Sequence, residues 1–240
     1  DRFDARLWGA LGEAGLLGLH LREEHDGAGL GLLELCRVLV EIGRTVAPVP
    51  LASHGIAGLL LDEVGSAEQR NAFLTDVAEG SQLLSLALSE EFDALPERPT
   101  TTAEPEGVDW VLEGTKVLAR AGMRADAFLV SAQTPQGPAV FVVRADDAGV
   151  SREAQHTSDG DTTAAVRLSA VRLGAERLIG STDGVAATRL NQLAAVAVAA
   201  EQFGVTQGAL ALTAAYGKSR EQFGRPIATF QAVSQRLADG

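Results

Sequence analysis

The sequence predicts an α+β protein in which a helical domain, a strand-rich domain and a second helical domain follow one another. Two changes in the spacing of apolar residues support this prediction. Helical spacing gives way to alternation after Gly80, and helical spacing returns near Ser181. We therefore expect an N-terminal helical domain over residues 1–80, a middle β domain over 81–180, and C-terminal helices over 181–240.

The composition limits the kinds of ligand that the chain can bind. With 240 residues, of which 46% are hydrophobic, one or two domains with a real core are expected. The net charge is −12, and Lys116 and Lys218 are the only lysines. A broad nucleic-acid or anionic-membrane surface is therefore not expected, and an anionic ligand has to be held by local arginines.

The cysteine and histidine content favours a cytoplasmic protein without a metal site. Cys36 is the only cysteine, which excludes an internal disulfide, and the four histidines lack metal-ligand spacing. We find no charged-then-apolar leader and no apolar run near the roughly 18 residues of a membrane span. Neither secretion nor membrane insertion is expected.

Four helices are expected in the first domain. The second helix ends before the segment Ala47-Pro-Val-Pro, because proline lacks a backbone donor. Ser66 and Gln69 form a capping box at the start of the fourth. The expected ranges are 3–14, with Gly15 as the stop, 32–43, 51–64 and 66–79, with Gly80 as the stop.

The connector His25-Asp-Gly-Ala-Gly-Leu-Gly has two interpretations. Its glycines are typical of a phosphate-binding loop, but no strand precedes it and its spacing differs from a dinucleotide fingerprint. A glycine-rich turn is the favoured interpretation.

The middle domain is predicted to hold several short strands in a small sheet or barrel. Leu84, Leu86 and Leu88 alternate with polar or small residues, as in a half-buried strand. An acidic loop is expected over 90–107. The further strands are expected over 110–118, as two short strands around a glycine turn, and over 128–132, 139–143 and 164–173.

A long helix is predicted to open the last domain. Small and apolar residues recur at helical spacing from Leu190 to Ala214. Its many alanines and glycines permit close helix contact, so an internal core helix and a subunit interface remain equally open.

The segment from Tyr216 to Asp239 reads as helix, turn, helix. Gly224 and Pro226 mark the turn, and Thr229 is expected to cap the second helix. Several polar and aromatic residues crowd this turn: Arg220, Gln222, Phe223, Arg225, Phe230 and Gln231. Guanidinium groups can hold phosphates and rings can contact a base, so a nucleotide site and a solvated helix end are both possible.

The pattern Arg-x-x-Phe-Gly-x-Pro-Ile-x-x-Phe-Gln, followed by Leu-Ala-Asp, resembles the flavin-contacting segment of acyl-CoA dehydrogenases. The resemblance implies that Arg220 and Gln231 meet the pyrophosphate and adenine end of FAD on a neighbouring subunit. Gln222 and Phe223 would lie alongside. It also implies that the C-terminal bundle is incomplete here, because the family continues with helices that carry the catalytic glutamate of most members.

The chemistry implied by the resemblance is α,β-dehydrogenation of an acyl-CoA thioester. In the family a carboxylate removes the α proton, and flavin N5 accepts a hydride from the β carbon. No catalytic residue and no metal ligand is assigned to this chain.

The chain departs from the family pattern in three places. Ser89-Glu-Glu-Phe-Asp stands where members have Thr-Glu-Pro and a Gly-Ser segment. Lys116-Val-Leu-Ala-Arg-Ala stands where members place a Trp and a Thr against the isoalloxazine. Gln192 and Ala195 stand where an acid and an arginine hold CoA. The resemblance then implies no isoalloxazine against this chain's own strand module, whose space Arg120 could fill.

These losses beside an intact arm favour a partner subunit of a heteromeric, possibly α2β2, acyl-CoA dehydrogenase. Actinobacterial members of the family pair an active with a degenerate chain, often on CoA thioesters of steroid side chains. Two alternatives stay open. One is a self-sufficient homotetramer, and the other is a non-enzymatic scaffold.

Overall fold

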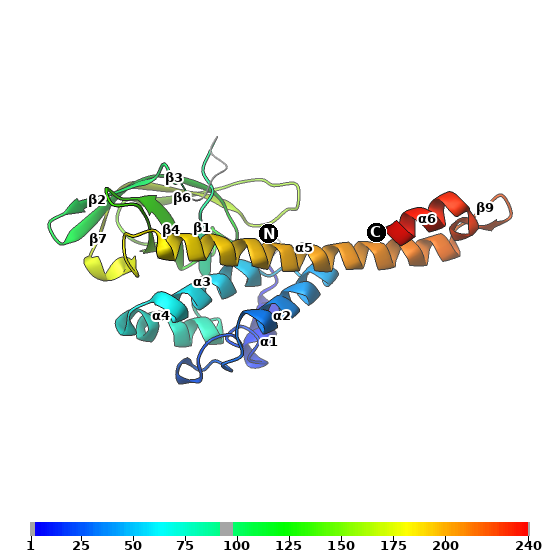
Figure 1. Cartoon of the computed structure of the whole chain (residues 1–240), viewed down its shortest axis with the longest axis horizontal. Helices are drawn as coiled ribbons and strands as arrows, with labels where there is room; N and C mark the ends of the chain where they lie inside the picture. Colours follow the sequence, from blue (N-terminus) through cyan, green and yellow to red (C-terminus); the bar gives the residue numbers. More distant parts are fainter. Residues whose placement is uncertain (1–2, 92–97, 240) are drawn as a thin grey trace.

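The computed structural model describes residues 3–91 and 98–239 and confirms the predicted α+β class. Four helices lie on one side, an eight-stranded sheet lies on the other, and a long helix runs between them and beyond both (Figure 1). The type of secondary structure changes between residues 79 and 84 and again between 179 and 185. The division into three domains at these places stays a prediction.

The N-terminal helices lie close to where the sequence predicts them. The capping box is confirmed, since Ser66 Oγ accepts from the Gln69 backbone N–H and Gln69 Oε1 accepts from the Ser66 N–H. Gly80 ends the fourth helix with a φ of 77°. The helices are α1 (Ala5–Glu13), α2 (Leu32–Thr45), α3 (Leu51–Val64) and α4 (Ala67–Glu79), with the short 3-10 helix η1 (Glu23–His25) in the glycine-rich connector.

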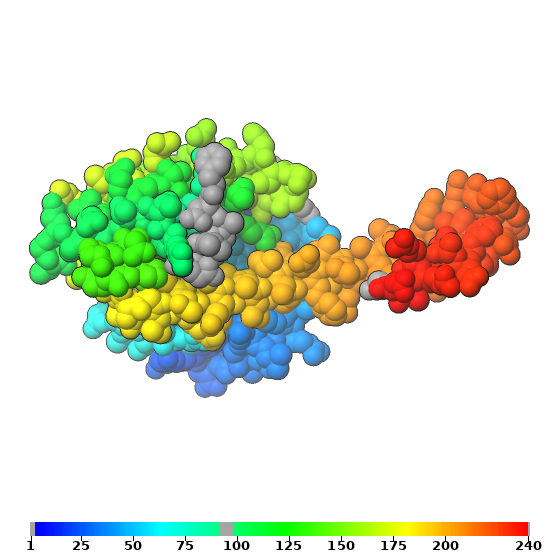
Figure 2. All heavy atoms as spheres, turned by 45° about the horizontal axis from the view of Figure 1, so that its top comes forward, coloured from blue at the N-terminus to red at the C-terminus, as the bar shows by residue number. Residues whose placement is uncertain are grey.

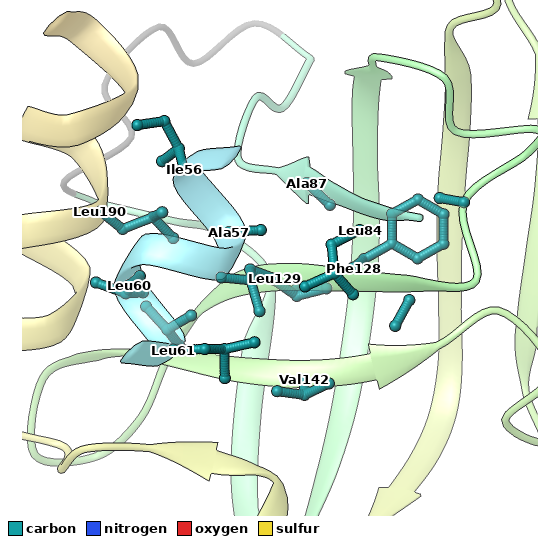
Figure 3. Packing of buried hydrophobic residues seen from close by; sticks show 14 of the residues in the cluster. Ile56, Ala57, Leu60, Leu61, Leu84, Ala87, Phe128, Leu129, Val142 and Leu190 are labelled. Atoms are coloured by element: carbon teal, nitrogen blue, oxygen red, sulfur yellow. The ribbon is translucent and has the colours of Figure 1, made fainter. Parts of the chain in front are cut away.

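Helix α3 is the centre of the core. Every residue from Leu51 to Asp62 is buried, as expected for a helix that is apolar all round. Figure 3 shows why: Ile56 and Leu60 face the long helix near its residue Leu190, while Leu61 lies near the sheet. The helix thus joins both layers of the molecule.

The strands form one mixed sheet in the order β6-β7-β3-β2-β4-β5-β8, with β1 paired to β4. Two of the strand pairs, β4 with β1 and β4 with β2, are parallel, and the other pairs are antiparallel. The strands are β1 (Leu84–Ala87), β2 (Thr102–Glu106), β3 (Asp109–Ala119), β4 (Ala127–Gln133), β5 (Pro138–Arg144), β6 (Val150–Ala154), β7 (Ala164–Leu173) and β8 (Leu178–Ile179); the 3-10 helix η2 (Ala175–Arg177) precedes β8.

The structure corrects three expectations for the strands. The stretch around Gly114 is one continuous strand, β3, in which the register shifts between Leu112 and Gly114, because the glycine supports a bulge and not a turn. Strand β1 is buried on both faces, with Ser85 donating to the Arg120 carbonyl oxygen. The expected loop over 90–107 contains β2; its residues 92–97 lie outside the described part of the chain.

The C-terminal segment is a long helix followed by a hairpin and a short helix. These elements are α5 (Val185–Ser219), the strands β9 (Glu221–Gln222) and β10 (Arg225–Pro226), the 3-10 helix η3 (Ile227–Thr229) and α6 (Gln231–Asp239). The capping prediction for Thr229 is wrong, because its hydroxyl donates to the Pro226 carbonyl oxygen inside η3 and α6 begins two residues later.

Helices α2 and α5 cross in backbone contact. A Cβ added at Gly43 would overlap the Glu201 carbonyl oxygen, and one added at Gly204 would overlap the Val40 carbonyl oxygen. One turn further along, a Cβ at Gly208 would lie 2.5 Å from the Arg44 carbonyl oxygen. The glycines of both helices are therefore required by the close packing, which favours the core interpretation for this part of α5.

Beyond this crossing α5 is largely exposed. Among its large apolar residues after Gly208, Leu212 is 73% exposed and Tyr216 is 56% exposed. By length and composition alone α5 could also cross a membrane, with a mean hydropathy of 1.2 in its most apolar window. The sequence expectation of no apolar run near 18 residues therefore does not hold for α5, whose apolar residues are mostly alanines. The same helix packs against α2, α3 and β5, but only 17% of this apolar window is buried, so packing within the chain covers only part of its apolar surface.

Replacing Gly204 by alanine tests the crossing. We expect Gly204→Ala to lower the free energy of unfolding by about 3 kcal/mol, because the helices have to move apart. Gly9→Ala in α1 is the matched control, since no atom lies within 4 Å of its Cβ position. This control is expected to be neutral or stabilising by up to about 1 kcal/mol. Urea unfolding of both variants is the measurement, and equal stabilities would contradict the proposed contact.

Candidate functional site

The four predicted cofactor-contacting residues lie together at the far end of α5. Arg220 caps α5, Gln222 ends β9, Phe223 lies in the hairpin turn and Gln231 begins α6. The hairpin folds back because the Ile227 N–H donates to the Arg220 carbonyl oxygen at 2.8 Å. Figure 2 shows this tip projecting from the body of the molecule, and we refer to residues 220–231 as the arm.

The side chains of the arm face solvent. Phe223 is 93% exposed, and its positive φ of 55° fits the tight turn that it shares with Gly224. Within the described residues, the Arg220 guanidinium makes no hydrogen bond or ion pair. The Gln222 side chain donates only to the Glu221 carbonyl oxygen, at 2.7 Å. An exposed ring next to an unpaired guanidinium is typical of a surface that another molecule covers.

Aromatic contacts hold the arm in shape. The rings of Phe223 and Phe230 meet edge to face with centroids 6.1 Å apart. The Arg225 guanidinium lies over the Phe230 ring at 4.3 Å from its centroid. Because Phe230 directly precedes Gln231, these contacts connect the hairpin turn to the start of α6.

The part of the strand module where the family pattern expects flavin contacts lies around Ser89 and Leu118. The Val117 N–H donates to the Ser89 carbonyl oxygen at 2.9 Å, which brings together two of the segments that depart from the family pattern. Leu118 is 52% exposed and has a φ of 56°, and its N–H donates to Gln155 Oε1 at 2.7 Å. Leu118 therefore offers neither an aromatic face nor a hydroxyl at this place.

Arg120 fills the space between the strand module and α5. Its Nη1 lies 2.6 Å from Glu201 Oε2, its Nη2 lies 3.2 Å from Glu201 Oε1, and its Nε lies 2.9 Å from Asp161 Oδ2. Burial lowers the pKa of Arg120, but the hydrogen bonds and charges of Glu201 and Asp161 outweigh burial and raise it. The three side chains form a firmly closed ionic cluster, which we call the Arg120 cluster.

The Arg120 cluster lines a small cavity of about 260 Å³. The other walls come from the α2–α3 connector, residues 46–50, and from Phe3 and Val205. The side chains of Asp161 and Glu201 are only 19% and 18% exposed. Both carboxylates are thus engaged in ion pairs with Arg120.

A second ion pair fixes the end of β1. Lys116 Nζ lies 2.6 Å from Glu90 Oε1, and both side chains are at most 5% exposed. Burial raises the pKa of Glu90, but the hydrogen bonds from Lys116, Thr101 and Thr100 outweigh it and lower the pKa to about 2. The pair holds the loop after β1 against β3 and serves a structural role.

Two positions of α5 stand where the family pattern expects CoA contacts. Gln192 and Ala195 lie on exposed positions of α5, and neither can form the acid–arginine pair expected at a CoA site. Among the described residues, no group of three or more His, Cys, Asp or Glu side chains could hold a metal ion.

Sequence reasoning found the arm but missed the Arg120 cluster. The arm is local, since its residues lie within twelve positions of one another. Arg120 stands 41 positions from Asp161 and 81 positions from Glu201, and no spacing rule connects such residues. Only the surplus charge at position 120, in a segment where a hydroxyl is expected, could have indicated that Arg120 has acidic partners.

The geometry agrees with comparisons to known proteins. Residues 1–81 match the family model of the acyl-CoA dehydrogenase N-terminal domain, and residues 183–240 match that of the acyl-CoA dehydrogenase C-terminal domain. The chain is 39% identical to acyl-CoA dehydrogenase FadE27 of Mycobacterium tuberculosis, covering 100% of this chain and 63% of that protein. FadE28 of the same organism is also 39% identical, over 97% of this chain and 65% of its own length. The chain belongs to the acyl-CoA dehydrogenase family.

Several solved structures also resemble the chain. A variant of the Tcur3481-Tcur3483 steroid ACAD superposes with a TM-score of 0.94 at 45% identity, covering 99% of this chain and 64% of that one. The ChsE4-ChsE5 complex from Mycobacterium tuberculosis gives 0.93 at 38% identity, covering 100% and 64%. A glutaryl-CoA dehydrogenase of Mycobacterium smegmatis in complex with FADH2 gives 0.88 at 27% identity, covering 99% and 63%. The acyl-CoA-dehydrogenase-like fold is thereby confirmed, and the chain spans less than two thirds of each relative.

Replacing Arg120 tests how much the Arg120 cluster contributes to the free energy of unfolding. Arg120→Met leaves two partly buried carboxylates without their cation, so we expect the free energy of unfolding at pH 7 to fall by about 2 kcal/mol. Adding Glu201→Gln should recover part of this loss. The control is Arg172→Met, whose partner Glu106 is 52% exposed; it should cost less than about 1 kcal/mol. Urea titrations measure all three, and similar losses for Arg120→Met and Arg172→Met would contradict the prediction.

Proposed function

We propose that this chain is a subunit of an FAD-dependent acyl-CoA dehydrogenase and supplies flavin contacts to the active site of an unlike partner subunit. The observation that carries the proposal is the contrast between the exposed arm and the Arg120 cluster, which stands in the segment where the family pattern expects a flavin contact. The substrate class is an acyl-CoA thioester, from a fatty acid or a steroid side chain. The cellular location that fits this role is the cytoplasm.

The arm fits the phosphate end of a dinucleotide. The Arg220 guanidinium has no partner within the described residues, and it can donate two parallel hydrogen bonds to a pyrophosphate. Gln231 opens a helix, where backbone N–H groups and the helix dipole favour negative charge nearby. The exposed ring of Phe223 provides an apolar surface next to them. Because the arm projects from the body, its ligand has to be held largely by another subunit.

The strand module does not fit a flavin ring of its own. Leu118 supplies no aromatic wall, and Arg120 is tied to α5 by short ion pairs. Admitting a ring beside Leu118 would require moving a neutralised, partly buried cluster, which is costly. We therefore propose that the isoalloxazine lies on the partner and that flavin contacts with Leu118 and Ser89 are absent.

Each part of the proposed assembly has a separate task. FAD, when bound, supplies the hydride acceptor for the β carbon of the substrate. In this chain Arg220 binds and orients the diphosphate, and Phe223 and Gln231 help to fix its position. No side chain of this chain is proposed as the base. The heteromeric relatives, the ChsE4-ChsE5 complex and Tcur3481-Tcur3483, support a hetero-oligomer, for example of the α2β2 type.

The visible spectrum separates the three functions that the sequence leaves open. Purified alone, the chain is expected to be colourless, and co-expressed with its partner it should carry FAD. Stoichiometric FAD without a partner, bleached by an acyl-CoA, would instead establish a self-sufficient homo-oligomer. A colourless chain that binds no dehydrogenase partner would establish a scaffold.

The role of Arg220 is tested by substitution in the complex. A charge-assisted bidentate contact is worth about 1.5–3 kcal/mol, so Arg220→Ala should weaken FAD binding by roughly ten- to a hundredfold. Arg220→Lys should recover only part, because a point charge lacks the planar fork. Arg236→Ala, at an exposed arginine of α6, is the matched control and should leave affinity unchanged. An unchanged FAD affinity in Arg220→Ala would remove the proposed contact.

A further inference from the structure

A second, larger cleft lies away from both the arm and the Arg120 cluster. It has a volume of about 490 Å³ and is formed by the end of α4, the turn between β3 and β4, the end of β5 and strand β6. Three arginines from three of these segments line it, namely Arg124, Arg144 and Arg152. We propose that this cleft binds a small molecule through a diphosphate group, a function beyond the proposed flavin contact.

Two arginines of the cleft, Arg144 and Arg152, contact groups that leave their charge in place. The Arg144 guanidinium lies 5.3 Å from the centroid of the Phe73 ring. Arg152 Nη1 donates to three backbone carbonyl oxygens, those of Gly122 at 3.2 Å, Met123 at 3.3 Å and Ala125 at 3.1 Å. Within the described residues, neither Arg144 nor Arg152 has a carboxylate partner. Both are therefore oriented in advance and remain able to bind an anion.

The acidic residues of the cleft do not cancel this charge. Asp76, Asp126 and Asp146 also line it, but all three are exposed to water, whereas Arg144 and Arg152 are half-buried. Asp126 already accepts the Leu83 N–H at 2.7 Å through Oδ2. Charges at exposed positions are screened more strongly than those at buried positions, so the inner part of the cleft favours an anion.

The size and the polar lining indicate what kind of anion fits. A cavity of about 490 Å³ is larger than one phosphate needs and lies within the range of small-molecule sites. Two arginines on separate strands suit a group with two phosphates, and Arg124 adds a third cation at an exposed position. Gln82 also lines the cleft and adds a polar side chain to its wall.

The proposal is tested by calorimetric titration of the full chain with pyrophosphate at low salt. We expect binding with a Kd below about 1 mM, and roughly tenfold weaker binding in Arg144→Gln and in Arg152→Gln. Arg144→Lys keeps the charge and should lose less. Arg37→Gln, at an exposed arginine of α2 that does not line the cleft, is the charge-matched control.

The arm has to be excluded as the source of the signal, because FAD also contains a pyrophosphate. Binding that persists in Arg220→Ala and weakens in Arg144→Gln supports the cleft. Loss of binding in Arg220→Ala, no binding up to 10-fold above the expected Kd, or equal affinity in Arg144→Gln, Arg152→Gln and the control would each overturn it. The FAD content of the complex with the partner is expected to be unchanged in Arg144→Gln, so the two proposals can fail independently.

Titrations with ADP and adenosine then identify the source of the diphosphate. Tighter binding of ADP than of pyrophosphate, with no binding of adenosine, indicates a nucleotide whose diphosphate provides the attachment. Similar affinities for ADP and pyrophosphate indicate that the diphosphate alone is recognised. Adenosine binding as tightly as ADP would overturn the role of the arginines.

Discussion

The backbone contact between α2 and α5 fixes the arrangement of the whole chain. Gly43 and Gly204 have no side chain, and each faces a carbonyl oxygen of the other helix at a distance that no Cβ could share. Dense packing of this kind leaves the two helices little freedom to slide or rotate. The direction of α5 is therefore set where it leaves the core, and with it the position of the arm at its end (Figure 1).

The same crossing explains why the Arg120 cluster forms. Glu201, whose carbonyl oxygen faces Gly43, is held by the crossing and presents its carboxylate to the strand module. Arg120 then pairs with a carboxylate that is fixed in advance, so little side-chain entropy is lost on its side of the pair. The Arg120 cluster and the exposure of the arm thus both depend on one rigid helix.

Four arginines of the chain differ in the groups that contact their guanidinium. Arg120 is neutralised by two carboxylates, whereas Arg220 is exposed and makes no ion pair within the described residues. Arg144 and Arg152 lie between these cases, because an aromatic ring or backbone carbonyl groups orient them without removing their charge. In a chain with a net charge of −12, such local cations are the places where an anion can bind.

The sequence by itself determined the α+β class, the helix boundaries near Ser66 and Gly80, and the grouping of the arm. These features depend on residues close in the chain, where capping, periodicity and turn chemistry act. Only the tertiary structure decided that β3 continues through Gly114, that Arg120 pairs with Asp161 and Glu201, and that α5 projects beyond the core. Each of these depends on contacts between distant segments, such as the ion pair that spans 81 positions, and local patterns contain no record of such contacts.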